Sequence, residues 1–211
     1  MRGRRLLKGS HRGSTIVEKT DDSESYVATD AMGNVYVAIG FSGTDVAFAD
    51  KKLTSTAMDV GVAKLTPDGK QALWAVKLGG DGKDTPYAIS VDGNAVYVAG
   101  AFASTTLDAS GKPLAKGTST RPQGFIAKLD AATGAGQWVD GFTIADGSNP
   151  LEGARCRSVR AVGNDVAFAC DYYGSLTFPG GTNVLTDRFG VIVGKLDASN
   201  GTMKARQLSR I

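Results

Sequence analysis

The sequence "SVDGNAVYVAGAF" (Ser90–Phe102), followed after a polar loop by "GFIAKLDAATGAGQW" (Gly124–Trp138), decides the fold. A similar pair of segments precedes it, "DAMGNVYVAIGF" (30–41) and "DVGVAKLTPDGKQALW" (59–74). A third pair follows it, "RAVGNDVAFACDY" (160–172) and "FGVIVGKLDASNG" (189–201). One module therefore occurs three times, and repetition of this kind is the signature of a repeat architecture.

Equivalent apolar anchors align the three copies. Val35, Val96 and Val166 begin matching apolar runs, and the two intervals between them differ in length. Unequal intervals indicate that loop lengths vary whereas the strands keep their register, because connecting segments run over the surface. A period of roughly 60 to 70 residues suits a four-stranded sheet with one extended loop.

Each module consists of short β-rich runs separated by turn signals. In the second copy, a turn at Asp92-Gly93-Asn94 joins the first two runs, and residues 125–129 and 137–142 supply the other two. Helical periodicity is absent, and the long polar connections 42–59, 103–123 and 174–188 are expected to be irregular loops. The sequence therefore predicts an all-β fold of twelve strands, arranged as a β-propeller-like arc of three four-stranded antiparallel blades.

The predicted domain boundaries follow the repeats. Residues 1–24 are expected to be a disordered basic leader, and the blades are expected at 25–80, 81–142 and 143–211. The net charge of +3 is concentrated in the leader, so the repeats offer no broad basic face and nucleic-acid binding is not expected. No apolar run reaches the ~20 residues of a membrane-spanning helix, and the leader lacks the apolar core of a secretion signal.

The module resembles the bacterial β-propeller repeats known as SBBP repeats. The segments that carry the resemblance are Gly33–Ala38, Asp59–Leu65, Trp74 and Leu78–Gly100. The likeness extends over about residues 25–208 and weakens in the third copy, where Cys170 replaces the glycine equivalent to Gly100. The resemblance implies a non-catalytic scaffold of secreted or surface-attached bacterial proteins, and it implies no substrate.

Three blades are fewer than the 4 to 8 that usually close a propeller. An arc of three leaves two blade faces exposed, and such faces act as association surfaces. We therefore expect either further blades from a longer chain or self-association with a second copy to complete a six-bladed ring.

Large aromatic residues recur at equivalent positions and are expected to pack between blades. These residues are Trp74, Trp138, Phe41, Phe102 and Tyr172. Repetition at a fixed position favours core packing over a role as a sugar-stacking platform, because a large aromatic buries much apolar area.

The two cysteines, Cys156 and Cys170, flank the predicted turn at Gly163-Asn164. A three-residue loop centred on Gly163 places them opposite each other, so that a disulfide is available, whereas a two-residue loop shifts the register and they miss. The sequence leaves open whether they form a disulfide or two buried thiols.

Candidate catalytic and metal-binding residues do not converge. The only histidine is His11 in the leader, and no nucleophile elbow or phosphate-binding loop is present. Asp81 and Asp84 in "GGDGKD" are interpreted as turn residues rather than calcium ligands. We expect no metal and no cofactor.

Two classes of function follow. The favoured class is a non-enzymatic binding or display scaffold, extracellular or at the cell surface, with a protein or glycan ligand on the rim formed by the long loops. The alternative is an enzyme, either a polysaccharide-cleaving propeller or a quinoprotein-like one, because "AKLDAATGAGQW" (127–138) also resembles the Trp-docking motif of pyrroloquinoline-quinone propellers.

Overall fold

The computed structural model describes residues 24–116, 119–145, 152–184 and 189–210. The predicted leader, residues 1–24, falls outside this part of the chain except for Glu24. The strands are β1 (Ser25–Thr29), β2 (Val35–Phe48), β3 (Lys51–Leu65), β4 (Ala72–Gly79), β5 (Asp84–Asp92), β6 (Ala95–Phe102), β7 (Thr106–Ala109), β8 (Pro113–Ala115), β9 (Gln123–Asp130), β10 (Gly136–Ile144), β11 (Gly153–Val162), β12 (Asp165–Tyr173), β13 (Leu176–Phe178), β14 (Gly181–Val184), β15 (Phe189–Asp197) and β16 (Met203–Arg210).

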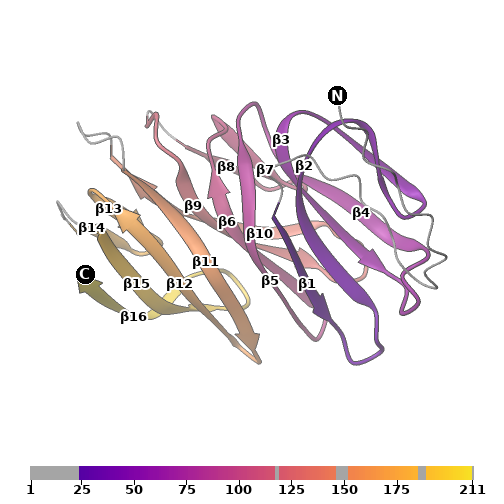
Figure 1. Cartoon of the computed structure of the whole chain (residues 1–211). Coiled ribbons are helices and arrows are strands. Elements are labelled where there is room, and N and C mark those ends of the chain that lie inside the picture. The colour runs from indigo at the N-terminus through magenta and orange to yellow at the C-terminus, as the bar shows by residue number, and fades with distance from the viewer. Residues whose placement is uncertain (1–23, 117–118, 146–151, 185–188, 211) are drawn as a thin grey trace, which may run out of the picture.

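The strands form three antiparallel sheets that follow one another across the molecule (Figure 1). The first sheet has the order β1-β2-β3-β4-β7-β8, the second β14-β13-β10-β9-β6-β5, and the third β11-β12-β15-β16. The described residues contain no helix, so none is present that could cross a membrane. The prediction of an all-β chain built from antiparallel sheets is confirmed.

Four strands arise where the sequence indicated irregular loops. The hairpin β7–β8 leaves the second repeat and pairs with β4 of the first sheet, and β13–β14 leaves the third repeat and pairs with β10 of the second. Twelve strands were therefore too few. Each hairpin covers an outer edge strand whose backbone groups otherwise lack a partner, which explains why such polar segments become strands.

Apolar residues between the sheets form two continuous junctions. The first junction lies between the first and second sheets and contains Leu78, Phe102, Phe125 and Leu129. The second junction joins the second and third sheets. The first strands of the sheets are neighbours, because β5 contacts both β1 and β11.

The first sheet curls over its own outer face. The connection 42–59 was expected to be an irregular loop, but β2 and β3 continue through it as an arm, residues 42–56, which folds back over the sheet. The ring of Phe48 in the arm packs 5.5 Å from that of Phe41 and lies directly over Gly61, where any side chain would collide with it. Asp50 accepts a 2.7 Å hydrogen bond from the backbone N–H of Ala72. The arm thus closes the face that a preceding sheet would otherwise cover.

Candidate functional site

A side-chain clamp on one backbone carbonyl holds the first junction. Trp74 Nε1 and Lys64 Nζ both donate hydrogen bonds to the carbonyl oxygen of Ala131, at 3.1 and 3.2 Å. The Tyr36 ring packs edge-on against Trp74 with 6.0 Å between centroids, and Lys64 Nζ lies 5.1 Å from its centre. The Asp30 carboxylate, 3.7 Å from Lys64 Nζ, balances a charge that burial would otherwise make costly.

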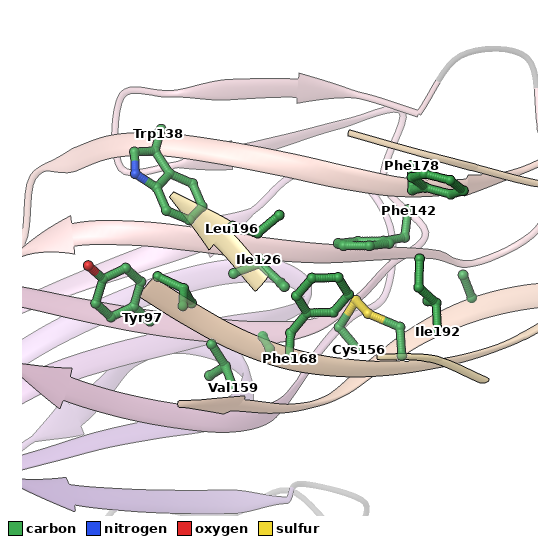
Figure 2. Close-up of a cluster of buried hydrophobic side chains, with 14 of the residues drawn as sticks. Tyr97, Ile126, Trp138, Phe142, Cys156, Val159, Phe168, Phe178, Ile192 and Leu196 are labelled. Atoms are coloured by element: carbon green, nitrogen blue, oxygen red, sulfur yellow. A yellow bond between two sulfur atoms is a disulfide. The ribbon is translucent and has the colours of Figure 1, made fainter. Parts of the chain in front are cut away.

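The second junction repeats the clamp. Trp138 Nε1 and Lys128 Nζ donate hydrogen bonds to the carbonyl oxygen of Ala198, at 3.3 and 2.7 Å. The Tyr97 ring lies 6.0 Å from the indole and 5.9 Å from Lys128 Nζ. Figure 2 shows Tyr97 and Trp138 at one end of this junction. Both tryptophans are therefore structural parts of the clamps and are not exposed to a ligand.

The other aromatic residues selected from the sequence occupy different places. Phe102 is buried in the first junction, and Tyr172 is buried in the second. Phe41 was also expected between blades, but it lies on the outer face of the first sheet under the arm. Its position differs because the face that it shares with Val37 and Ile39 points away from the second sheet.

Two hollows lie beside the clamps, near the short turns. The first has a volume of about 400 Å³ and is lined by residues that include Asp30, Lys64 and Asn94. The second, of about 310 Å³, is the equivalent place at the next junction and includes Lys128. The two lysines already bind the clamped carbonyls, so the strongest polar groups of both hollows are engaged.

The aspartates of "GGDGKD" bind the chain itself. Asp81 accepts hydrogen bonds from the backbone N–H and the hydroxyl of Thr105, at 2.7 and 2.9 Å. Asp84 is buried and accepts from the N–H of Ala103 at 3.0 Å and from the hydroxyl of Ser104 at 2.6 Å. Burial raises the pKa of Asp84 to about 6. Among the described residues, no group of three or more metal-ligating side chains is assembled.

Asp140 places a carboxyl group within the second junction. It occupies the position that Val76 has in the first junction, two residues after the clamp tryptophan. One oxygen, Oδ2, is buried without a hydrogen-bond partner and faces the backbone of Gly201. Burial raises the pKa of Asp140 to about 6. Such a group costs stability when it is ionised.

The cysteines form a disulfide, although the turn between them has two residues. Val162 pairs with Asp165 across the turn, a register in which Cys156 would miss Cys170. A β-bulge at Arg157 inserts one extra residue into β11 and restores the alignment, so that the two cysteines are paired and bonded. The disulfide lies beside Phe168 and near Phe142, inside the second junction (Figure 2).

A cluster of tyrosine, arginine and carboxylate side chains lies on and beside the first strands β1, β5 and β11. Its members are Glu24, Tyr26, Tyr87, Arg157 and Asp171, and we call it the tyrosine–arginine cluster. The Arg157 guanidinium lies 4.6 Å from the centre of the Tyr87 ring, and its Nε donates a 3.0 Å hydrogen bond to Asp171. Tyr26 donates a hydrogen bond to Glu24 and is close enough to respond electrostatically to Tyr87 and Arg157.

The electrostatics of this cluster tie its members together. Burial and the hydrogen bond to Glu24 raise the pKa of the Tyr26 phenol to about 12. The hydrogen bond to Asp171 raises the pKa of the Arg157 guanidinium. The cluster thus presents two aromatic rings, one cation and two anions, and it remains partly open to solvent.

Two β-bulges position the cluster. Tyr87 lies at the register shift between Pro86 and Ala88, and Arg157 lies at the shift between Cys156 and Ser158. A bulge re-aims the extra side chain away from the regular alternation of the strand. Sequence reasoning missed these residues, although the offset between Val96 and Val166 places Tyr87 and Arg157 at the same repeat position.

Comparison with known proteins adds no family. No protein-family model matches the chain, and no curated protein matches it. The fold and the site therefore define only a class, an all-β protein of stacked antiparallel sheets with clamped junctions.

Proposed function

We propose that this chain is a non-catalytic binding and display module whose sheets are blades of a propeller-like arc. Three features support this arrangement. Consecutive sheets share apolar junctions, the first strands are neighbours around one side of the stack, and each hairpin connects a repeat to the sheet before it.

The single observation that carries a binding function is the tyrosine–arginine cluster. Strands from all three repeats converge there, whereas the other prominent lysine, tryptophan and aspartate side chains are engaged in clamps and loops. Aromatic rings beside charged groups suit protein epitopes and sugar rings, because they combine apolar area with hydrogen bonding. Tyr87 lies near the start of β5 and Arg157 lies at the middle of β11.

We propose an extracellular or cell-surface location for the module. The Cys156–Cys170 disulfide supports this location, because disulfides persist in oxidising compartments. The resemblance to SBBP repeats, which are found in secreted bacterial proteins, supports the same location.

A binding screen tests the proposal. The immobilised chain is exposed to a panel of soluble polysaccharides and extracellular proteins, and any binder is measured again with Tyr87→Ala and Arg157→Ala. Each variant should weaken binding at least tenfold, which corresponds to ~1.4 kcal/mol. Arg160→Ala, on the same strand outside the cluster, is the matched control. The cluster is the wrong site if Arg160→Ala weakens binding equally or if only changes at the β7–β8 tip, residues 110–112, abolish it.

The quinoprotein-like alternative depends on the segment that contains Trp138. Here the indole of Trp138 clamps Ala198 between two sheets, a role that needs no cofactor. No observation in the described residues favours the enzyme alternatives. Incubation with the quinone and calcium, followed by an absorbance scan and an assay for loss of polysaccharide viscosity, would test both.

A further inference from the structure

We propose that the outer face of the third sheet docks against the same face of a second copy, giving a two-fold dimer. This surface, which we call the open face, consists of Val162, Ala167, Ala169, Tyr173, Phe189, Val191 and Val193. The inference does not rest on the proposed function, although Asp171 of the tyrosine–arginine cluster lies on the same face of the third sheet.

The centre of the open face, on β12 and β15, is apolar and exposed, and charged side chains such as Arg160 and Lys195 flank it. Val162, Val193 and Phe189 are 67%, 51% and 47% exposed. They alternate along their strands with fully buried residues such as Ile192, so the register that fills the second junction necessarily turns them outward. The Tyr173 and Phe189 rings pack together with centroids 5.2 Å apart and thicken one end of the patch. A contiguous patch of this kind marks an association surface.

A further repeat of the same type does not fit this face. Each junction in the chain depends on a tyrosine and a tryptophan next to a lysine, but the corresponding positions here are Ala167 and Ala205, next to Lys195. Lys195 instead forms an ion pair with Asp165, with Nζ and Oδ2 3.0 Å apart. The third sheet therefore lacks the clamp that receives a following sheet.

The first sheet of another copy does not fit either. In a head-to-tail ring, the open face would meet the outer face of the first sheet, but the arm already occupies that face. Phe48 of the arm is fully buried against it, and the arm is anchored by Asp50. Among the sheet faces that the structure describes, the others are already covered, so another open face is the one that remains available to pair with it.

Two charges on the third sheet, Lys195 and Asp171, are complementary under a two-fold axis. Lys195 lies toward the turn end of the patch, and Asp171 lies toward the opposite end of the neighbouring strand. If two open faces meet with their strands antiparallel, Lys195 of each copy approaches Asp171 of the other. Charges of both signs at opposite ends of an apolar patch suit an isologous interface, in which the same surface is used twice.

The area of the open face sets the expected affinity of the dimer. Four strands spaced ~4.8 Å apart and about eight residues long give a footprint of roughly 500 Å² per copy. Standard interfaces bury about 800 Å² per partner. We therefore expect a reversible dimer that dissociates on dilution.

Sedimentation velocity over a wide concentration range tests the dimer. The unaltered chain should shift from monomer to dimer as concentration rises, and Val193→Glu should abolish the shift. Leu73→Glu is the matched control, because Leu73 is 50% exposed on β4, away from the open face. Circular dichroism verifies that both variants are folded. A chain that stays monomeric throughout, or a Leu73→Glu variant that loses the dimer as fully, would overturn the proposal.

A charge exchange tests the two-fold geometry. Lys195→Glu and Asp171→Lys should each weaken the dimer about tenfold, which corresponds to ~1.4 kcal/mol. The double variant should recover most of the affinity, because the two charges exchange places across the axis. Failure of the double variant to recover, with both single variants impaired, would exclude the antiparallel arrangement. Arg157→Ala, which also removes the partner of Asp171 within the chain, should leave the dimer intact.

Discussion

At the scale of single residues, the two junctions differ at the position two residues after the clamp tryptophan. Val76 fills that position in the first junction, whereas Asp140 places a partly buried carboxyl in the second, with one oxygen unpartnered. The junctions are alike in the clamp, where a lysine and a tryptophan share one carbonyl, but only the second junction contains the disulfide. The effect of a carboxyl on junction stability can therefore be measured inside one molecule.

Replacement of Asp140 by Val should stabilise the fold at neutral pH. The pKa of Asp140 rises from 3.8 to about 6 on folding, so the folded state holds the proton more tightly. The contribution of the protonated Asp140 to the free energy of unfolding is fully present below about pH 4 and is lost as the pH rises through 6. Urea denaturation should show Asp140→Val more stable at pH 7.5 by on the order of 1–2 kcal/mol, since solvent screens a partly exposed carboxyl.

Asp84 also has a raised pKa and titrates in the same range. The contribution of Asp140 is therefore the difference between the pH profile of the unaltered chain and that of Asp140→Val, in which the contribution of Asp84 cancels. Asp140→Asn is the control that keeps the shape. A stabilisation by Val that does not change between pH 4 and 7.5 would show that packing, rather than charge, is responsible.

The clamp tryptophans should contribute in two separable parts. Trp138→Phe removes the indole N–H and should cost about 1 kcal/mol, because Lys128 still binds the Ala198 carbonyl. Trp138→Ala also removes the ring and should cost about 3–5 kcal/mol. The same pair of changes at Trp74 is the internal comparison. Equal losses for Phe and Ala in chemical denaturation would contradict a packing role.

At the scale of strands, the sequence predicted the twelve meander strands because each alternates or runs apolar between turn signals. Val96 and Val98 face one junction, and Tyr97 and Ala99 face the other, a pattern visible without coordinates. The hairpins β7–β8 and β13–β14 escaped prediction because their pairing partners belong to another repeat. Local sequence carries no information about an edge that lies in a different sheet.

The tyrosine–arginine cluster escaped prediction for a related reason. A β-bulge is defined by the register of two strands, and a single residue such as Arg157 carries no mark of it. Gly163-Asn164 correctly indicated the turn, and the two cysteines indicated a possible bond, but only the bulge reconciles them. The positions of the β-bulges, which depend on the register of two paired strands, could therefore not be predicted from the sequence.

Removal of the disulfide should destabilise the β11–β12 hairpin. The bond closes a loop with a sequence separation of 14 residues. Loop-closure entropy for about 15 residues corresponds to ~3 kcal/mol. Cys156→Ala combined with Cys170→Ala should lower the free energy of unfolding by about that amount, measured with urea in the absence of reductant. Reduction of the unaltered chain should produce a similar loss, and no change in either experiment would show that the hairpin is held by packing alone.

At the scale of the whole molecule, the two ends of the stack are finished differently. The first sheet covers its own outer face with the arm, and the third sheet leaves its outer face open. The apolar residues Val37, Ile39 and Phe41 on the first sheet depend on the arm for burial. The arm therefore decides which end of the stack can associate.

Phe48→Ala should weaken the arm and change how the chain associates. Loss of a fully buried phenylalanine should cost about 3–5 kcal/mol. Exposure of the outer face of the first sheet also supplies a second apolar face for association. Copies can then associate into open chains larger than a dimer, because the contact does not close into a symmetric pair. We expect increased binding of a hydrophobic dye and species larger than a dimer in sedimentation. Val46→Ala, a smaller change in the same arm, is the control and should produce little of either effect.

In each pair of neighbouring repeats, a hairpin of the later repeat completes the sheet of the earlier one, and this sets the order in which the sheets can finish folding during synthesis. The outer edge of the first sheet is β4, and it stays bare until β7 and β8 have left the ribosome with the second repeat. The second sheet waits in the same way for β13 and β14. A nascent chain halted after Gly79 should therefore be vulnerable to proteases and to chaperone capture, and it should become resistant only once Ala115 has emerged.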